Sequence, residues 1–92
     1  MNGFMENVTI ENKVERQVKI RHGVVLKSDL CASVQAPSIK VLRGDIASLC
    51  AAHEAAKLEY SRFEKKHHVS RDFAIRLITH IFGDCKIILT TD

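Results

Sequence analysis

The stretch IKVLRGDIASLCAAHEAAKLEYSRF, residues 39–63, carries a single apolar stripe with a histidine in its middle. The positions recur in steps of three and four, which is the spacing that puts side chains on one narrow face of a helix. The stripe consists of Ile39, Leu42, Ile46, Leu49, His53, Ala56, Tyr60 and Phe63. This pattern predicts one long central helix that organises the core of a small chain.

The start of this helix contains a weak point at Gly44-Asp45. Glycine inside a helix costs about 1 kcal/mol relative to alanine, and Asp45 is a residue type that can cap a new helix. Residues 39–43 could therefore form a strand or a separate turn, although Ser38 is placed to cap a helix that begins there. The sequence predicts a continuous helix over residues 45–66.

The N-terminal part alternates between apolar and polar residues with a period of two. Over residues 8–26, seven of the ten even-numbered positions are apolar, which indicates strands with one polar face. A two-residue loop would move the apolar set to odd positions, so we expect a three-residue loop over 21–23 that ends in glycine. This predicts an antiparallel hairpin of 14–20 with 24–28, and a similar loop at 11–13 would extend it into a meander.

The C-terminal third has the signals of a second helix followed by a strand. Ser70 is a predicted N-cap and Gly83 a predicted C-terminal stop. The apolar face between them consists of Ala74, Leu77, Ile78 and Ile81. Residues 85–90, CKIILT, favour a last strand that completes the sheet. Residues 29–37 show little periodicity and are expected to be a connection.

These segments predict one α+β domain over residues 1–92. It has an N-terminal antiparallel hairpin or meander, the long central helix, the second helix and a C-terminal strand that joins the sheet. Only 5% of the residues are aromatic, so the core is thin, and burial of further surface in an oligomer would stabilise it.

Composition also indicates a compartment. The sequence has no apolar run long enough to span a membrane and no secretion signal. Its three cysteines, Cys31, Cys50 and Cys85, are odd in number and contain no CxxC pair. Free thiols of this kind are typical of a reducing environment, so we expect a cytoplasmic protein that does not bind membranes.

The candidate chemical groups do not form a recognisable reactive site. The histidines and cysteines lack the close paired spacings of a structural zinc site, so we expect no metal or other cofactor. Cys50 and His53 lie one helical turn apart and could touch, but nothing nearby clearly orients such a pair. With no glycine-rich phosphate loop and no GxSxG motif, the sequence predicts a protein that is not an enzyme and has no catalytic residue.

Self-association is the use of the apolar stripe that its flanking charges favour. A parallel pair of helices would place Glu59 against Glu64 of the partner copy, whereas an antiparallel pair would match Arg43 with Glu64 and Asp45 with Lys66. The predicted interface consists of Ile46, Leu49, His53, Ala56, Tyr60 and Phe63. The alternative is that the same stripe packs on the chain's own sheet.

Our first functional hypothesis is a small non-enzymatic regulator of the inhibitor or antirepressor type, which binds another protein and forms an antiparallel homodimer through residues 45–66. The alternative is a DNA-binding transcription regulator that uses residues 58–82 as a helix-turn-helix-like segment. Its predicted nucleic-acid contacts are Lys65, Lys66, Arg71 and Arg76. The sequence does not identify the protein partner or a DNA site.

Overall fold

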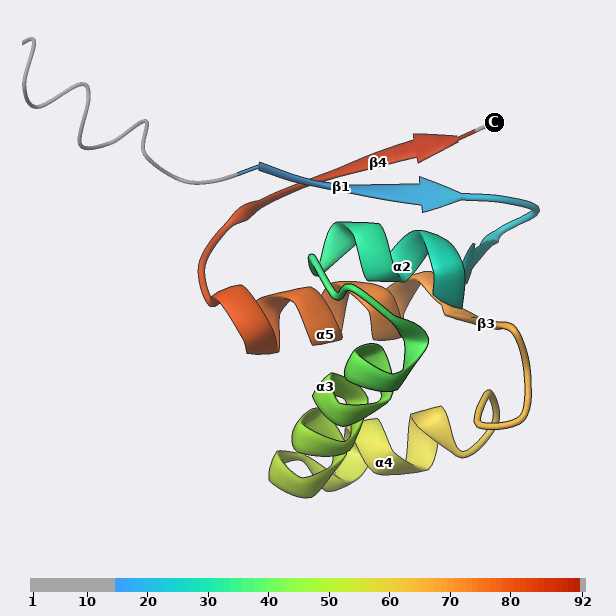
Figure 1. Ribbon diagram of the computed structural model, residues 1–92, viewed down its shortest axis with the longest axis vertical. Coiled ribbons are helices and arrows are strands. Elements are labelled where there is room, and N and C mark those ends of the chain that lie inside the picture. The colour runs from blue at the N-terminus through green and yellow to red at the C-terminus, as the bar shows by residue number, and fades with distance from the viewer. Residues whose placement is uncertain (1–14, 92) are drawn as a thin grey trace, which may run out of the picture.

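A computed structural model of the chain describes residues 15–91, which form an α+β fold in layers (Figure 1). A pair of strands lies above two helices, and two further helices lie below these. In chain order the elements are β1 (Glu15–Ile20), β2 (Val24–Leu26), α2 (Lys27–Ser33), α3 (Ile39–Ala52), α4 (Glu54–Tyr60), β3 (His68–Ser70), α5 (Arg71–Phe82) and β4 (Lys86–Thr91). The predicted α+β class is confirmed, while the loop predicted at 11–13 lies outside the described residues.

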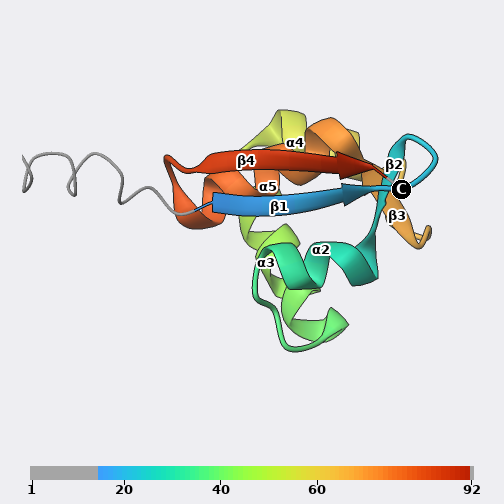
Figure 2. The ribbon, with the colours of Figure 1, turned by 90° about the horizontal axis from the view of Figure 1, so that it is seen from above.

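The strands form two separate pairs instead of one antiparallel sheet. β1 pairs with β4 in parallel, from Glu15 opposite Lys86 to Ile20 opposite Thr91 (Figure 2). β2 pairs with β3 in the antiparallel sense. The prediction that the C-terminal strand joins the N-terminal one is therefore confirmed. The hairpin of 14–20 with 24–28 is wrong in extent, because β1 and β2 share only an isolated bridge between Arg21 and Val24.

The turn between β1 and β2 has two residues, not the predicted three. His22 and Gly23 both have positive φ angles, 54° and 81°, and the backbone groups of Arg21 and Val24 hydrogen-bond across them. Two left-handed residues in succession make the type I′ turn that suits a right-twisted hairpin. After such a turn the side chains that face the core lie at odd-numbered positions, and Val25 is indeed fully buried.

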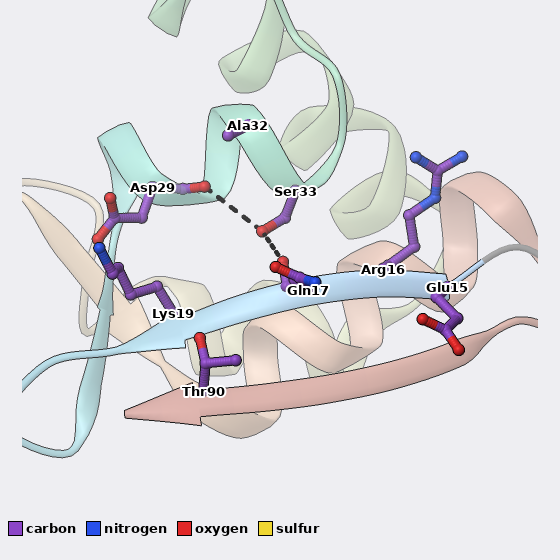
Figure 3. A pocket seen from close by; sticks show the side chains of 8 residues that line it. All are labelled: Glu15, Arg16, Gln17, Lys19, Asp29, Ala32, Ser33 and Thr90. Atoms are coloured by element: carbon purple, nitrogen blue, oxygen red, sulfur yellow. Dashed lines mark hydrogen bonds between the residues drawn. The ribbon is translucent and has the colours of Figure 1, made fainter. Parts of the chain in front are cut away.

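Helix α2 occupies part of the segment that was expected to be a connection. Its Leu30 is fully buried, and the Ser33 hydroxyl donates hydrogen bonds to the carbonyl oxygens of Gln17 at 2.6 Å and Asp29 at 3.4 Å. The helix therefore lies along the edge of β1 that β4 leaves free. Figure 3 shows the polar groove between them.

The central helix begins earlier and ends sooner than predicted. The Ser38 hydroxyl accepts a hydrogen bond from the Val41 amide, and α3 continues through Gly44 without a break. It ends at His53, where the backbone is extended (φ −138°, ψ 113°), and α4 then runs in a new direction. The prediction of one helix over residues 45–66 is therefore wrong.

Helix α5 packs beneath the strands. The Ser70 hydroxyl accepts a hydrogen bond from the Phe73 amide at 3.1 Å, and Gly83 ends the helix with a φ of 73°, as predicted. Phe73, Ala74, Leu77 and Ile78 are fully buried. They meet side chains from β1, β2, α2, α3, α4 and β3 in one core. None of the described helices is long and apolar enough to cross a membrane.

Candidate nucleic-acid interface

The predicted dimer stripe lies mostly inside the chain's own core. Leu49 and Ala56 are fully buried, and Ile46 is 2% exposed. Tyr60 stacks on Phe73 of α5 with ring centroids 5.2 Å apart. Ile46, Leu49 and Ala56 are therefore not available to a second copy, whereas Tyr60 is half-buried, and the homodimer stays a prediction.

The other two residues of the predicted interface, His53 and Phe63, are displaced by the break at residue 53. His53 is exposed, and its ring meets that of His80 at a centroid distance of 6.1 Å. Phe63 lies beyond the end of α4 in a turn and packs against His68, with centroids 5.8 Å apart. The stripe therefore folds back on itself and closes over α5, instead of running straight along one helix.

The segment predicted as a helix-turn-helix over residues 58–82 has a different structure. A turn and strand β3 separate α4 from α5, and the face of α5 that was expected to read DNA has a mixed charge. Arg76 forms an ion pair with Glu59 at 3.6 Å, and Arg71 approaches Asp72 at 3.8 Å. Each of these two guanidinium groups therefore has a carboxylate beside it, and their contact with phosphates stays a prediction.

A helix-turn-helix arrangement occurs instead in α2 and α3. The turn between them includes Gln35 in the left-handed conformation, with a φ of 58°, and the Ala36 amide closes it by donating to the carbonyl oxygen of Cys31 at 2.8 Å. In Figure 1, α3 runs downward across the direction of α2. This is the arrangement in which a second helix can be presented to a DNA groove.

Sequence reasoning missed this unit because α2 is short. The available signals were weak: Leu30 and Val34 are four residues apart, and Ser38 is a cap close behind them. Seven residues provide too few positions for a period of 3.6 to stand out.

The first half of α3 presents its outer side to solvent. Ile39 and Val41 are 36% and 42% exposed, and Lys40 and Arg43 are also exposed. Leu42 in the same turn is fully buried and holds the helix against the core. This half of α3 therefore combines apolar and cationic side chains on an open surface.

Lys27 brings a second basic segment to this surface. Its ammonium donates hydrogen bonds to the carbonyl oxygens of Phe63 at 2.9 Å and Glu64 at 3.2 Å, and lies 5.0 Å from the centroid of the Tyr60 ring. The Lys27 amide also donates to the carbonyl oxygen of His67 at 2.8 Å. The turn after α4 is thereby tied to the start of α2, beside α3.

Two adjoining hollows of about 570 and 560 Å³ lie where these segments meet. Arg43, Glu64 and Lys65 line both of them. We call their cationic lining the basic face; it consists of Lys27, Arg43, Lys57, Lys65 and Lys66. Within these two hollows Glu64 is the single carboxylate, so the surface has a clear excess of positive charge. Two of the four predicted nucleic-acid contacts, Lys65 and Lys66, belong to it, and Arg71 and Arg76 do not.

The remaining candidate groups are the Cys50 thiol and the metal-ligating side chains. Burial raises the pKa of the Cys50 thiol, with Glu64 acting in the same direction and Lys57 opposing it. A thiol held in its neutral form is a weak nucleophile. Over residues 15–91, no three side chains of the metal-ligating types come close enough to hold an ion.

The groove between α2 and β1, of about 450 Å³, is lined by charges of both signs (Figure 3). Its Asp29 accepts a 2.9 Å charge-assisted hydrogen bond from Arg21, and Lys19 points toward the same carboxylate. The carboxylate is therefore already engaged by the protein's own cation.

No family model, curated protein or solved structure matches this chain.

Proposed function

We propose that the chain is a non-enzymatic, cytoplasmic regulator that binds duplex DNA through α3 and the basic face. The observation that carries this proposal is the open first half of α3, which is flanked by cations from α2, α4 and the turn after α4. Duplex DNA is a dense polyanion, and cations that neutralise its phosphates supply most of the affinity of non-specific binding. An α-helix fits the major groove of B-form DNA.

The side chains on this surface suit the two kinds of contact that such an interface requires. Lys65 and Lys66, which are exposed beside the helix, would contact phosphates and fix its position. Lys40 and Arg43 would reach base edges, and Val41 would meet thymine methyl groups. The deep, narrow major groove of duplex RNA does not admit a helix in this way, so the proposal is specific for DNA.

The proposal is tested with two double variants that remove the same charge from different faces. Duplex binding is measured by fluorescence anisotropy at several salt concentrations, with a duplex RNA of the same sequence as control. Lys65→Ala/Lys66→Ala should lower affinity and reduce the slope of log K against log salt by about 2, since two phosphate contacts are lost. The matched variant Arg71→Ala/Arg76→Ala should change the slope little. Equal effects of the two variants, or equal binding to the RNA, would contradict the proposal.

A second candidate function, regulation by binding another protein as an inhibitor or antirepressor, is favoured by one exposed side chain. Leu58 on α4 is 66% exposed and borders a surface hollow of about 660 Å³ with Ala47 and Ala51 of α3. Exposed apolar groups in a hollow can serve as an anchor for a partner. In a pull-down from the native host, a stoichiometric partner should be lost from Leu58→Lys but retained by Lys86→Ala. Absence of a partner that depends on Leu58 would remove this candidate.

A further inference from the structure

Strand β4 has one paired edge and one open edge. Within the described residues it is the outer member of a two-stranded parallel sheet, and no strand lies beyond it (Figure 2). Parallel sheets normally occur with both faces covered, and sheets of two strands are rarely stable alone. A two-stranded parallel sheet whose outer strand, β4, has an unpaired edge is therefore unusual.

The two edges of the sheet are protected very differently. The edge of β1 that does not pair with β4 is covered by α2, whose Ser33 donates a hydrogen bond to the Gln17 carbonyl oxygen. In β4, Lys86 is the single charged residue, and its Nζ lies 3.8 Å from Oε2 of Glu15 in β1. Natural edge strands are usually shielded by charges, proline or bulges. The middle of β4, Ile-Ile-Leu, has none of these.

The apolar side chains of β4 are incompletely covered on both faces of the sheet. Ile87 packs against the core, and Leu89, which by alternation shares its face, remains 41% exposed. Ile88 lies on the opposite face, opposite Gln17 in the β1–β4 register, and is half-buried. A strand added at this edge would cover both Leu89 and Ile88.

We propose that a second copy of this chain occupies the edge, with the two β4 strands paired antiparallel about a twofold axis at Ile88. Antiparallel partners that lie directly opposite each other share a face, and the axis must map each face onto itself. Centring on Ile88 satisfies both conditions. Ile88 then meets its own counterpart, Ile87 meets Leu89 of the other copy, and Lys86 meets Thr90.

This register is self-complementary in charge and in hydrophobicity. The lysine of each strand faces a threonine and not the other lysine, and every apolar residue faces an apolar residue. The result is a continuous four-stranded sheet in the order β1-β4-β4-β1. This arrangement replaces the helix-mediated dimer predicted from the sequence and is independent of the proposed DNA-binding function.

The experiment measures the mass of the full chain by sedimentation velocity over a roughly hundredfold range of concentration, in the absence of DNA. The wild type should shift from monomer to dimer as concentration rises. Ile88→Lys and Ile88→Glu should each weaken the dimer by at least about tenfold, because like charges would face each other at the axis. An equimolar mixture of the two variants should restore association, which a folding defect would not allow.

The matched control is Gln17→Lys, which adds a positive charge to the same face of the neighbouring strand, opposite Ile88 in the register. It should leave the dimer unchanged. A wild-type chain that stays monomeric at every concentration, a dimer that is insensitive to Ile88→Lys, or variants that fail to associate when mixed would each overturn the proposal.

Discussion

The Lys27 ammonium lies 2.9 Å from the carbonyl oxygen of Phe63, a residue that is 36 positions away in the sequence. This hydrogen bond joins the first turn of α2 to the turn that carries Lys65 and Lys66. The contact holds this basic turn beside the exposed half of α3, where the basic face forms. We therefore expect this hydrogen bond to contribute both to the stability of the fold and to the proposed DNA binding.

Replacement of this ammonium should lower both stability and affinity. Lys27→Met keeps the apolar stem and removes the donor, which should reduce the free energy of unfolding by about 1.5–3 kcal/mol, the usual contribution of a hydrogen bond that involves a charged group. Urea denaturation measures the change. The control is Lys40→Met, which removes an exposed lysine of α3 and should change stability little. Equal destabilisation by the two variants would contradict the role assigned to Lys27.

The central stripe should behave as a core and not as a dimer interface. Leu49→Ala should reduce the free energy of unfolding by about 2–5 kcal/mol, because Leu49 is fully buried. The matched control is Leu58→Ala, whose side chain is 66% exposed and whose truncation should cost less than about 0.5 kcal/mol. Denaturant titrations compare them. A small effect of Leu49→Ala, or an effect limited to the dimer mass, would contradict the assignment.

Gly44 of α3 and Gly23 of the β1–β2 turn should respond to alanine in opposite directions. Gly44 is helical, and a Cβ added there meets no atom within 4 Å, so Gly44→Ala should stabilise the chain by about 0.5–1 kcal/mol. Gly23 has a φ of 81°, so Gly23→Ala should destabilise it by about 1–2 kcal/mol. Thermal denaturation measures both. Changes of the same sign would be inconsistent with the turn and helix described.

The Cys50 thiol should add a dependence on alkaline pH. Burial raises its pKa above the ordinary value of 9.0, so the folded state favours the neutral thiol more than the unfolded state does. The resulting stabilisation is fully present below pH 9.0 and is lost as the pH rises through the raised pKa. Between neutral and alkaline pH, the wild type should therefore lose more stability than Cys50→Ala. Identical pH profiles from urea denaturation would show that the thiol makes no such contribution.

Local signals in the sequence predict the ends of several elements. Ser38 and Ser70 cap helices, and Gly83 ends α5, because a hydroxyl acceptor or a left-handed residue acts within one helical turn. The apolar face of α5 is also predicted, since its period of 3.6 continues over three turns. These features depend on neighbours in the sequence and not on the rest of the fold.

The errors occur where contacts between distant segments decide the structure. The stripe continues across His53 with no proline or glycine to mark a break. The bend there places Ala56 in the core and stacks Tyr60 on Phe73 of α5, which are contacts between distant segments. Similarly, nothing within residues 85–90 indicates parallel pairing with β1. Of the candidate site, Lys65 and Lys66 are recognised from their local charge. Arg43 lies beside them only because the fold brings α3 next to the turn after α4. Helix α2 is too short for its apolar period to be recognised in the sequence.

We propose above that α3 and the basic face contact duplex DNA. It is tested most directly by titration of the isotopically labelled chain with a short duplex, followed by backbone amide NMR shifts. We expect shifts centred on residues 38–44 and 63–67, with the exposed face of α5 around Arg71 and Arg76 largely unaffected. Shifts centred on α5, or no shifts at low salt, would contradict it.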